Sequence, residues 1–293
     1  MINKADYYLL DVFTDRAFSG NPLAVFPHAE SMTTELMQAI ANELNLSETV
    51  FVSEANEANR YPIRIFTPTM ELPFAGHPTV GTAHLLMQLG WAKREQALIL
   101  EAGVGPLEVH FDEELACFTT ARPAKVSAST LNRSKAASLL GLEEHQVISE
   151  PVLGSCGLAF HLVELDSLEA LAKATPAPTL WASGITPSGE DTLYLYVIET
   201  NSGQGGRLRS RMFSMEGSLR EDPATGSAAA ALAGTLAIRQ PGNGAWRWII
   251  DQGVEMGRPS RIIAKAERRD NAPMTISIAG QAVIVGQGTM QIR

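Results

Sequence analysis

The chain of 293 residues has room for two domains of ordinary size, and its 45% hydrophobic content is typical of a globular protein. Its formal charge of −9 at pH 7 argues against a nucleic-acid or acidic-membrane surface, because such surfaces need a concentrated basic patch. The two cysteines, Cys117 and Cys156, form neither a metal-binding spacing nor a disulfide framework. Neither a secretory leader nor a bilayer-spanning apolar run is recognisable, so we expect a cytoplasmic protein with no membrane partner.

The first half of the chain alternates short β-type runs with two helices. The expected strands lie at 7–13, 23–26, 49–52, 64–66, 98–101, 106–111 and 116–120. The expected helices lie at 33–44, behind a Thr33 N-cap, and at about 78–89, ended by Gly90. The segment 122–130 lacks periodicity and is the best linker candidate.

The second half repeats this order of strands, a very apolar helix and more strands. The expected helices lie at 133–140, 168–173 and about 226–239. The expected strands lie at 152, 159–165, 192–198, 211–213, 246–250, 261–265 and 274–278. Gly203-Gln204-Gly205-Gly206 opens no helix and is interpreted as a flexible loop rather than a nucleotide site. The pattern predicts an α+β protein with similar domains at 1–122 and 130–281, and a strand at about 282–293 is a candidate to join the first.

Two heptapeptides, His77 to Ala83 and Asp222 to Ala228, resemble each other at a separation of 145 positions (222 minus 77). Each has a polar residue before Pro, then Gly three residues after it, a hydroxyl residue and Ala. We interpret them as equivalent helix starts of a duplicated domain. Unpaired N–H groups and a partial positive charge make a helix start suitable for carboxylates.

Capping is the plainer interpretation of each copy taken alone. Asp222 is a residue type that caps helices well, whereas His77 is not. Because a shared capping requirement does not explain His in one copy and Asp in the other, the pair favours acid–base chemistry. Gly81 and Gly226 are expected to let a ligand or another backbone approach closely.

Glu48 lies between an amphipathic helix and a β-type run, in Leu46-Ser47-Glu48-Thr49. A carboxylate that enters an apolar strand tends to be partly desolvated, which suits it to take and return a proton. The alternative is an ordinary exposed Glu in a turn.

Five motifs in order resemble the phenazine-biosynthesis-type isomerases, the PhzF family. They are Asp11-x-Phe13 with Phe18-x-Gly20-Asn21-Pro22-Leu23-Ala24-Val25, Leu46-Ser47-Glu48-Thr49, Arg64-x-Phe66-Thr67-Pro68, Gly76-His77-Pro78-Thr79 and Glu221-Asp222-Pro223-Ala224-Thr225-Gly226-Ser227-Ala228. The resemblance covers nearly the whole chain and implies a diaminopimelate-epimerase-like fold. In that fold each domain is a curled mixed sheet around a central apolar helix, with the active site in the interdomain cleft.

The resemblance also implies roles for particular residues. Glu48 matches the catalytic acid–base, and His77 and Asp222 match further catalytic residues. The substrate-binding positions are Ser47, Gly76, Gly226 and Ser227. A homodimer that needs neither cofactor nor metal is implied. The related epimerases use two cysteines at the helix starts, and these segments contain none here, so two-thiol chemistry is excluded.

The resulting hypothesis is a cofactor-independent isomerase in which Glu48 moves a proton, and with it a double bond, on a small carboxylate substrate. The helix starts and Ser227 would hold the carboxylate or the developing charge. One alternative is a non-catalytic metabolite-binding protein. A weaker one is a serine hydrolase that uses Ser227, although the local sequence lacks the second Gly of a nucleophile elbow.

Overall fold

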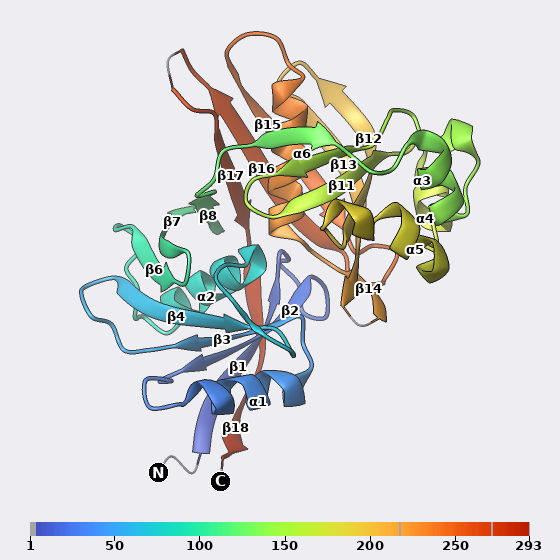
Figure 1. Ribbon diagram of the computed structural model, residues 1–293. Helices are drawn as coiled ribbons and strands as arrows, with labels where there is room; N and C mark the ends of the chain where they lie inside the picture. The colour runs from blue at the N-terminus through green and yellow to red at the C-terminus, as the bar shows by residue number, and fades with distance from the viewer. Residues whose placement is uncertain (1–3, 217, 271, 293) are drawn as a thin grey trace. The chain divides into compact units, whose positions relative to one another are not determined.

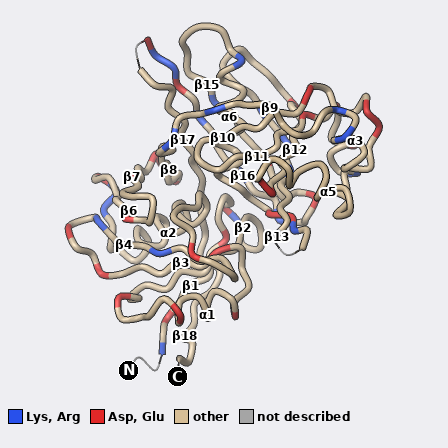
Figure 2. The backbone as a smooth tube through the Cα atoms, in the orientation of Figure 1, with Lys and Arg blue, Asp and Glu red and all other residues tan. Residues whose placement is uncertain are grey.

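The computed structural model describes residues 4–216, 218–270 and 272–292 and divides into two units. Unit 1 comprises the described residues up to Thr119 together with those from Ala279 onward, and unit 2 comprises those from Thr120 to Ile278. In both units Lys and Arg are interspersed with Asp and Glu (Figure 2). No helix in the described part of the chain has the length and apolar character that a membrane span requires.

Unit 1 contains a mixed sheet of short strands. In order of pairing they are β18 (Ala282–Gln291), β1 (Lys4–Val12), β2 (Asn21–Pro27), β3 (Glu48–Val52), β4 (Arg60–Phe66), β6 (Leu98–Ala102), β7 (Gly105–Asp112) and β8 (Leu115–Thr119). A two-residue strand, β5 (Glu71–Leu72), also pairs with β4. The β2–β3 and β4–β6 pairs are parallel and the others are antiparallel. Figure 1 shows β18, which follows unit 2 in the sequence, beside β1.

Unit 2 repeats this pattern. Its strands pair in the order β9 (Lys125–Ala128), β10 (Val152–Ser155), β11 (Ala159–Glu164), β12 (Thr192–Ser202), β13 (Gly205–Glu216), β15 (Gly244–Gln252) and β16 (Ser260–Arg268). β14 (Ser218–Asp222) also pairs with β13, and β17 (Thr275–Gly280) runs across the unit boundary. The parallel pairs β11–β12 and β13–β15 occupy the places of β2–β3 and β4–β6. The duplicated units therefore share the direction of these strands as well as their order.

Two sequence expectations in this region are wrong. The expected linker at 122–130 contains β9, whose side chains are all exposed, which explains why no periodicity marks it as a strand. The expected glycine loop is a tight turn of a long hairpin, and Gly205 and Gly206 already pair with β12. A Cβ at Gly206 would overlap the carbonyl of Thr200, so close backbone approach accounts for the glycine there.

A buried helix packs against the sheet of each unit. These helices are α2 (Gly76–Gln88) in unit 1 and α6 (Gly226–Ile238) in unit 2. Within unit 1, α2 contacts β1, β2, β3 and β18, and within unit 2, α6 contacts β10, β11, β15 and β16 (Figure 1). Both helices are buried around nearly their whole circumference, as expected for helices enclosed by a sheet.

Shorter helices cover the outer layers. They are α1 (Thr34–Leu44) between β2 and β3, and α3 (Arg133–Leu140), η1 (Glu144–Gln146), α4 (Leu168–Lys173), α5 (Pro178–Gly184) and η2 (Thr186–Ser188) in unit 2. The Thr33 hydroxyl accepts from the Leu36 N–H at 3.3 Å, and Gly141 ends α3 with φ 67°, which confirms both predicted helix ends. On the inner face of α1, Met37 and Ile40 are buried in the same hydrophobic cluster as Phe26 and Phe51.

The true register of the duplication differs from the one that the heptapeptides suggest. Both central helices have 13 residues and begin at Gly, which gives an offset of 150 (226 minus 76). The same offset relates Gly103, whose absent Cβ would lie 3.0 Å from Cα of Pro73, to Gly253, whose absent Cβ would lie 3.0 Å from Cα of Pro223. The predicted equivalence of His77 with Asp222 is therefore wrong by five residues.

A second pair of equivalent contacts keeps the offset of 150 at its glutamates (221 minus 71), whereas its arginines are 147 positions apart (211 minus 64). Arg64 binds Glu71 in unit 1, and Arg211 binds Glu221 in unit 2, with Nε–Oε1 distances of 2.7 and 2.8 Å. The two guanidinium groups also lie over the rings of Phe66 and Phe213, at 5.1 and 4.8 Å from the ring centroids.

Candidate active site

Glu48 is the first residue of β3 in unit 1. It follows the end of α1, where Asn45 adopts a left-handed conformation (φ 51°) and turns the chain toward the strand. Its side chain is 16% exposed, which is low for a carboxylate and leaves part of it accessible. Ser47, immediately before the strand, is exposed.

Three segments of unit 1 that are far apart in the sequence meet at the imidazole ring of His77. His77, the second residue of α2, places Nδ1 3.3 Å from Oε2 of Glu48. Asn21, the first residue of β2, places Nδ2 3.4 Å from the same nitrogen of His77. Because His77 and Asn21 are buried, their positions are fixed by packing, and Glu48 is the most exposed member of the cluster.

The His77 imidazole is neutral in the folded protein. Burial lowers its pKa to about 3, and a hydrogen bond to the backbone of Pro22 opposes this only in part. Its contact with Glu48 is therefore between a carboxyl group and a neutral ring. Nδ1 also lies beside Nδ2 of Asn21, and when unprotonated it can accept a hydrogen bond from that amide.

Unit 2 holds a second polar cluster at the start of α6. Asp222 is the last residue of β14, and Thr225 precedes the first residue of α6. The Thr225 hydroxyl donates to Oδ2 of Asp222. Gln252, at the end of β15, is fully buried and donates from Nε2 to the Asp222 carbonyl at 2.8 Å and to Oγ1 of Thr225 at 3.0 Å.

Neither His77 nor Asp222 is a helix cap, so the capping interpretation is wrong for both. The N-cap residues are Ala75 and Thr225, and neither makes a side-chain capping hydrogen bond. Asp222 lies on a strand because β14 forms a hairpin with β13, which the sequence did not reveal. Gly76 and Gly226 are the first residues of the helices and are buried, whereas Ser227 is half-buried in the first turn of α6.

Gly81 serves packing rather than a ligand. A Cβ on it would lie 2.6 Å from Leu23 and 2.7 Å from Val12 side-chain atoms, so α2 approaches β1 and β2 closely at this point. Of the two expected reasons for a glycine at this position, a ligand or another part of the chain, the structure shows the second, because residues of β1 and β2 fill the space.

Sequence reasoning did not assign site roles to Asn21, Thr225 or Gln252. Asn21 and Thr225 lie inside motifs that were recognised, but their contacts become visible only when distant segments are brought together. The only signal for Gln252 is a polar pair, Asp251-Gln252, directly after the apolar run that ends at Ile250.

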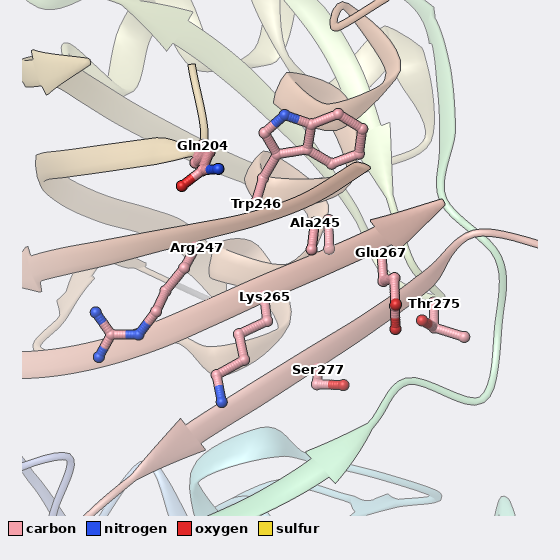
Figure 3. A pocket seen from close by; sticks show the side chains of 9 residues that line it. Gln204, Ala245, Trp246, Arg247, Lys265, Glu267, Thr275 and Ser277 are labelled. Carbon is pink, nitrogen blue, oxygen red and sulfur yellow. The ribbon is translucent and has the colours of Figure 1, made fainter. Parts of the chain in front are cut away.

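A hollow of about 360 Å³ on unit 2 lies apart from these segments in the sequence. Figure 3 shows the side chains that line it along β15, β16 and β17, among them Arg247, Lys265, Glu267 and Ser277. None of the predicted site residues belongs to this lining. The hollow carries charges of both signs and is not assigned to the candidate site.

Comparison with known proteins agrees with this architecture. The family described as "Phenazine biosynthesis-like protein" matches residues 10–288. A trans-2,3-dihydro-3-hydroxyanthranilate isomerase from Pseudomonas chlororaphis is 34% identical over 97% of this chain and 98% of its own length. An uncharacterized isomerase from Pasteurella multocida is 36% identical over 99% and 95%, respectively.

Solved structures show the same fold. A PhzF-family protein from Bacillus anthracis superposes with a TM-score of 0.88 at 24% identity, covering 99% of this chain and 100% of that one. A hydroxyproline epimerase from Agrobacterium vitis superposes with a TM-score of 0.64 at 12% identity, covering 99% and 93%. These likenesses confirm the predicted epimerase-like α+β fold. The chain belongs to the PhzF family of phenazine-biosynthesis-like proteins, and it is an isomerase.

Proposed function

We propose that this isomerase moves a proton and a double bond within a small carboxylate substrate, and that Glu48 is its acid–base group. The observation that carries the proposal is the contact between the partly exposed Glu48 carboxylate and a buried, neutral His77 at 3.3 Å. A protonated imidazole at that distance would weaken the carboxylate as a base, whereas a neutral one does not.

The proposed step needs no redox partner. Glu48 removes a proton from a carbon next to an activating group, and the electron pair left behind shifts the neighbouring double bond. Glu48 then returns a proton to another carbon, so that substrate and product are isomers, and between the two transfers the proton on Glu48 can exchange with solvent. While Glu48 carries the proton, the buried ring of His77 at 3.3 Å limits the movement of the Glu48 side chain by packing.

The substrate carboxylate is proposed to bind at helix N-termini. The first turns of α2 and α6 present N–H groups without side-chain caps, and the Ser227 hydroxyl lies in the first turn of α6. The related isomerases named for trans-2,3-dihydro-3-hydroxyanthranilate suggest a cyclic amino or hydroxy carboxylate as the substrate class.

Solvent exchange tests both the reaction and the substrate class. The protein is incubated in deuterated water with trans-2,3-dihydro-3-hydroxyanthranilate and a panel of cyclic and acyclic amino and hydroxy acids, and each compound is analysed by mass spectrometry. We expect deuterium incorporation into at least one compound with the wild-type protein. Glu48→Gln should abolish it, because the amide cannot take up the proton.

The matched control is Glu43→Gln, at an exposed position near the end of the preceding helix α1. It should exchange like the wild type, and circular dichroism should show that both variants are folded. Near-normal exchange by Glu48→Gln contradicts the assignment of Glu48. Asp222→Asn in the same assay determines whether unit 2 takes part in the reaction.

A further inference from the structure

A fully satisfied hydrogen-bond network surrounds Gln252 in unit 2. Its Oε1 accepts from the Thr225 N–H at 3.2 Å and from the Tyr194 hydroxyl at 3.1 Å. Its Nε2 donates to the Asp222 carbonyl and to Oγ1 of Thr225. Ser210, at 2.8 Å from the Tyr194 hydroxyl, completes the network. Tyr194, Ser210 and Gln252 are each fully buried, so solvent does not compete for these bonds.

The amide of Gln252 fixes the direction of the hydrogen bonds that reach Asp222. The opposite orientation would set its NH2 group against the N–H of Thr225 and would leave the Asp222 carbonyl facing an oxygen. In the observed orientation Oγ1 of Thr225 accepts a proton from Nε2. The Thr225 hydroxyl proton is then directed to the remaining neighbour, Oδ2 of Asp222, which must accept it.

The described residues at the corresponding places of the other half form no such network. At the offset of 150, the places of Asp222, Thr225 and Gln252 are taken by Leu72, Ala75 and Ala102, all of which have apolar side chains. Unit 1 nevertheless forms the same β-hairpin, the same glycine–proline contact and the same helix start. The shared fold therefore does not need the polar network. The presence of the network in unit 2 alone indicates a function specific to unit 2.

We propose that Gln252 and Thr225 are positioning residues that hold the Asp222 carboxylate as a hydrogen-bond acceptor of fixed orientation for the isomerase reaction. The proposal rests on the proposed function to the extent that Asp222 takes part in that reaction. Neither residue contacts the substrate in this proposal. Gln252 sets the direction of the Thr225 hydroxyl, and the hydroxyl sets the rotamer of Asp222.

Four variants test the proposal by exchange rate and by stability. Thr225→Val removes the hydroxyl and keeps the shape, and Thr225→Ser restores the hydroxyl. Gln252→Glu replaces the donor NH2 by an acceptor, which should draw the Thr225 hydroxyl away from Asp222. The control is Thr235→Val, on the same helix, which removes a buried hydroxyl that donates to the Ala231 carbonyl at 2.8 Å.

Thr225→Val and Gln252→Glu should lower kcat/KM for exchange about 10- to 100-fold, the range expected for one hydrogen bond to a charged group. Thr225→Ser should recover most of the rate, and Thr235→Val should leave it unchanged while lowering the unfolding midpoint about as much as Thr225→Val does. A Thr225→Val rate equal to that of Thr235→Val overturns the proposal, because a merely structural hydroxyl would behave in this way.

Crystal structures of the wild type and of Gln252→Glu decide the positioning without a substrate. The expected result in the variant is a Thr225 hydroxyl bonded to the introduced carboxylate and an Asp222 carboxylate turned away from Thr225. An unchanged Asp222–Thr225 bond overturns the proposal, even if Glu48→Gln abolishes exchange. If Glu48→Gln exchanges normally but Asp222 turns as expected, the proposed function fails and the positioning stands.

Discussion

The duplicated Arg–Glu pairs offer a comparison of one interaction at two depths of burial. In unit 2 the Arg211 and Glu221 side chains are 10% and 18% exposed, and in unit 1 the Arg64 and Glu71 side chains are 35% and 40% exposed. Arg211 also donates to the carbonyls of Leu171 and Ala174, each at 2.8 Å, next to the end of α4.

Replacing each Arg by Met should therefore have unequal costs. Arg211→Met leaves a largely buried carboxylate without its partner, which costs about 3–5 kcal/mol of unfolding free energy. Arg64→Met removes a pair that water screens well, which costs about 0–1 kcal/mol. The double variant Arg211→Met/Glu221→Leu should recover only part of the loss, because the two carbonyls near α4 still lack their donor.

Urea unfolding followed by tryptophan fluorescence measures these differences. Trp181, Trp246 and Trp248 report on unit 2, where the larger effect is expected, and Trp91 reports on unit 1. Equal losses for the two single variants would refute the argument from burial. Full recovery by the double variant would show that the carbonyl contacts contribute nothing.

Two further predictions concern the core around the site. Burial lowers the pKa of His77 to about 3, below its ordinary value of 6.5. Between these two pH values His77 binds a proton in the unfolded chain but not in the native state, so the unfolding free energy falls as the pH falls from 6.5 toward 3. Urea titrations at several pH values in this range give the unfolding free energy as a function of pH. This free energy should fall more steeply for the wild type than for His77→Gln, by up to about 1.4 kcal/mol per pH unit, and equal slopes would contradict the lowered pKa. Gly81→Ala should lower the unfolding free energy by about 1–3 kcal/mol in the same assay, because its methyl group would overlap Leu23 and Val12, and a neutral effect would mean that α2 shifts freely.

The secondary structure was largely predictable because the chain marks its elements locally. Helix 133–140 and helix 168–173 were predicted with their observed bounds, and in each case a cap residue or an apolar spacing marks the ends. β14 was missed because four of its five residues are polar and all five are at least partly exposed, so the strand depends on pairing with β13 rather than on its own pattern.

The register of the duplication was not predictable from the heptapeptides. They align Pro78 with Pro223, but Pro223 corresponds in the structure to Pro73, which packs against Gly103 as Pro223 packs against Gly253. An alignment of the two heptapeptides matches identical residues, whereas the two units of the structure share contacts between residues. The recurrence that keeps the correct offset is weaker in letters: Ile99 to Val104 and Ile249 to Val254.

The sequence nominates members of the candidate site one by one, but it does not predict their arrangement. Glu48 and His77 were identified through the family motifs, and their 3.3 Å contact follows only from the packing of α2 against β3. Gln252 is 27 positions from Thr225 and 30 from Asp222, and no local pattern connects them. Polar contacts of this kind depend on which strands become neighbours, which sequence periodicity does not determine.

The pairing of β18 with β1 affects the order in which this protein can form during synthesis. All of unit 2 is translated between the two segments of unit 1, and β18 pairs along the whole length of β1. On the ribosome, unit 2 can therefore fold first, although domains usually fold in the order of their translation. Until β18 emerges, β1 retains an open edge, and His84 of α2 lacks the Gly280 carbonyl that it contacts at 3.1 Å in the finished fold. The residue proposed as the acid–base, Glu48, is translated before unit 2, but the unit that holds it is completed only after unit 2, when β18 pairs with β1.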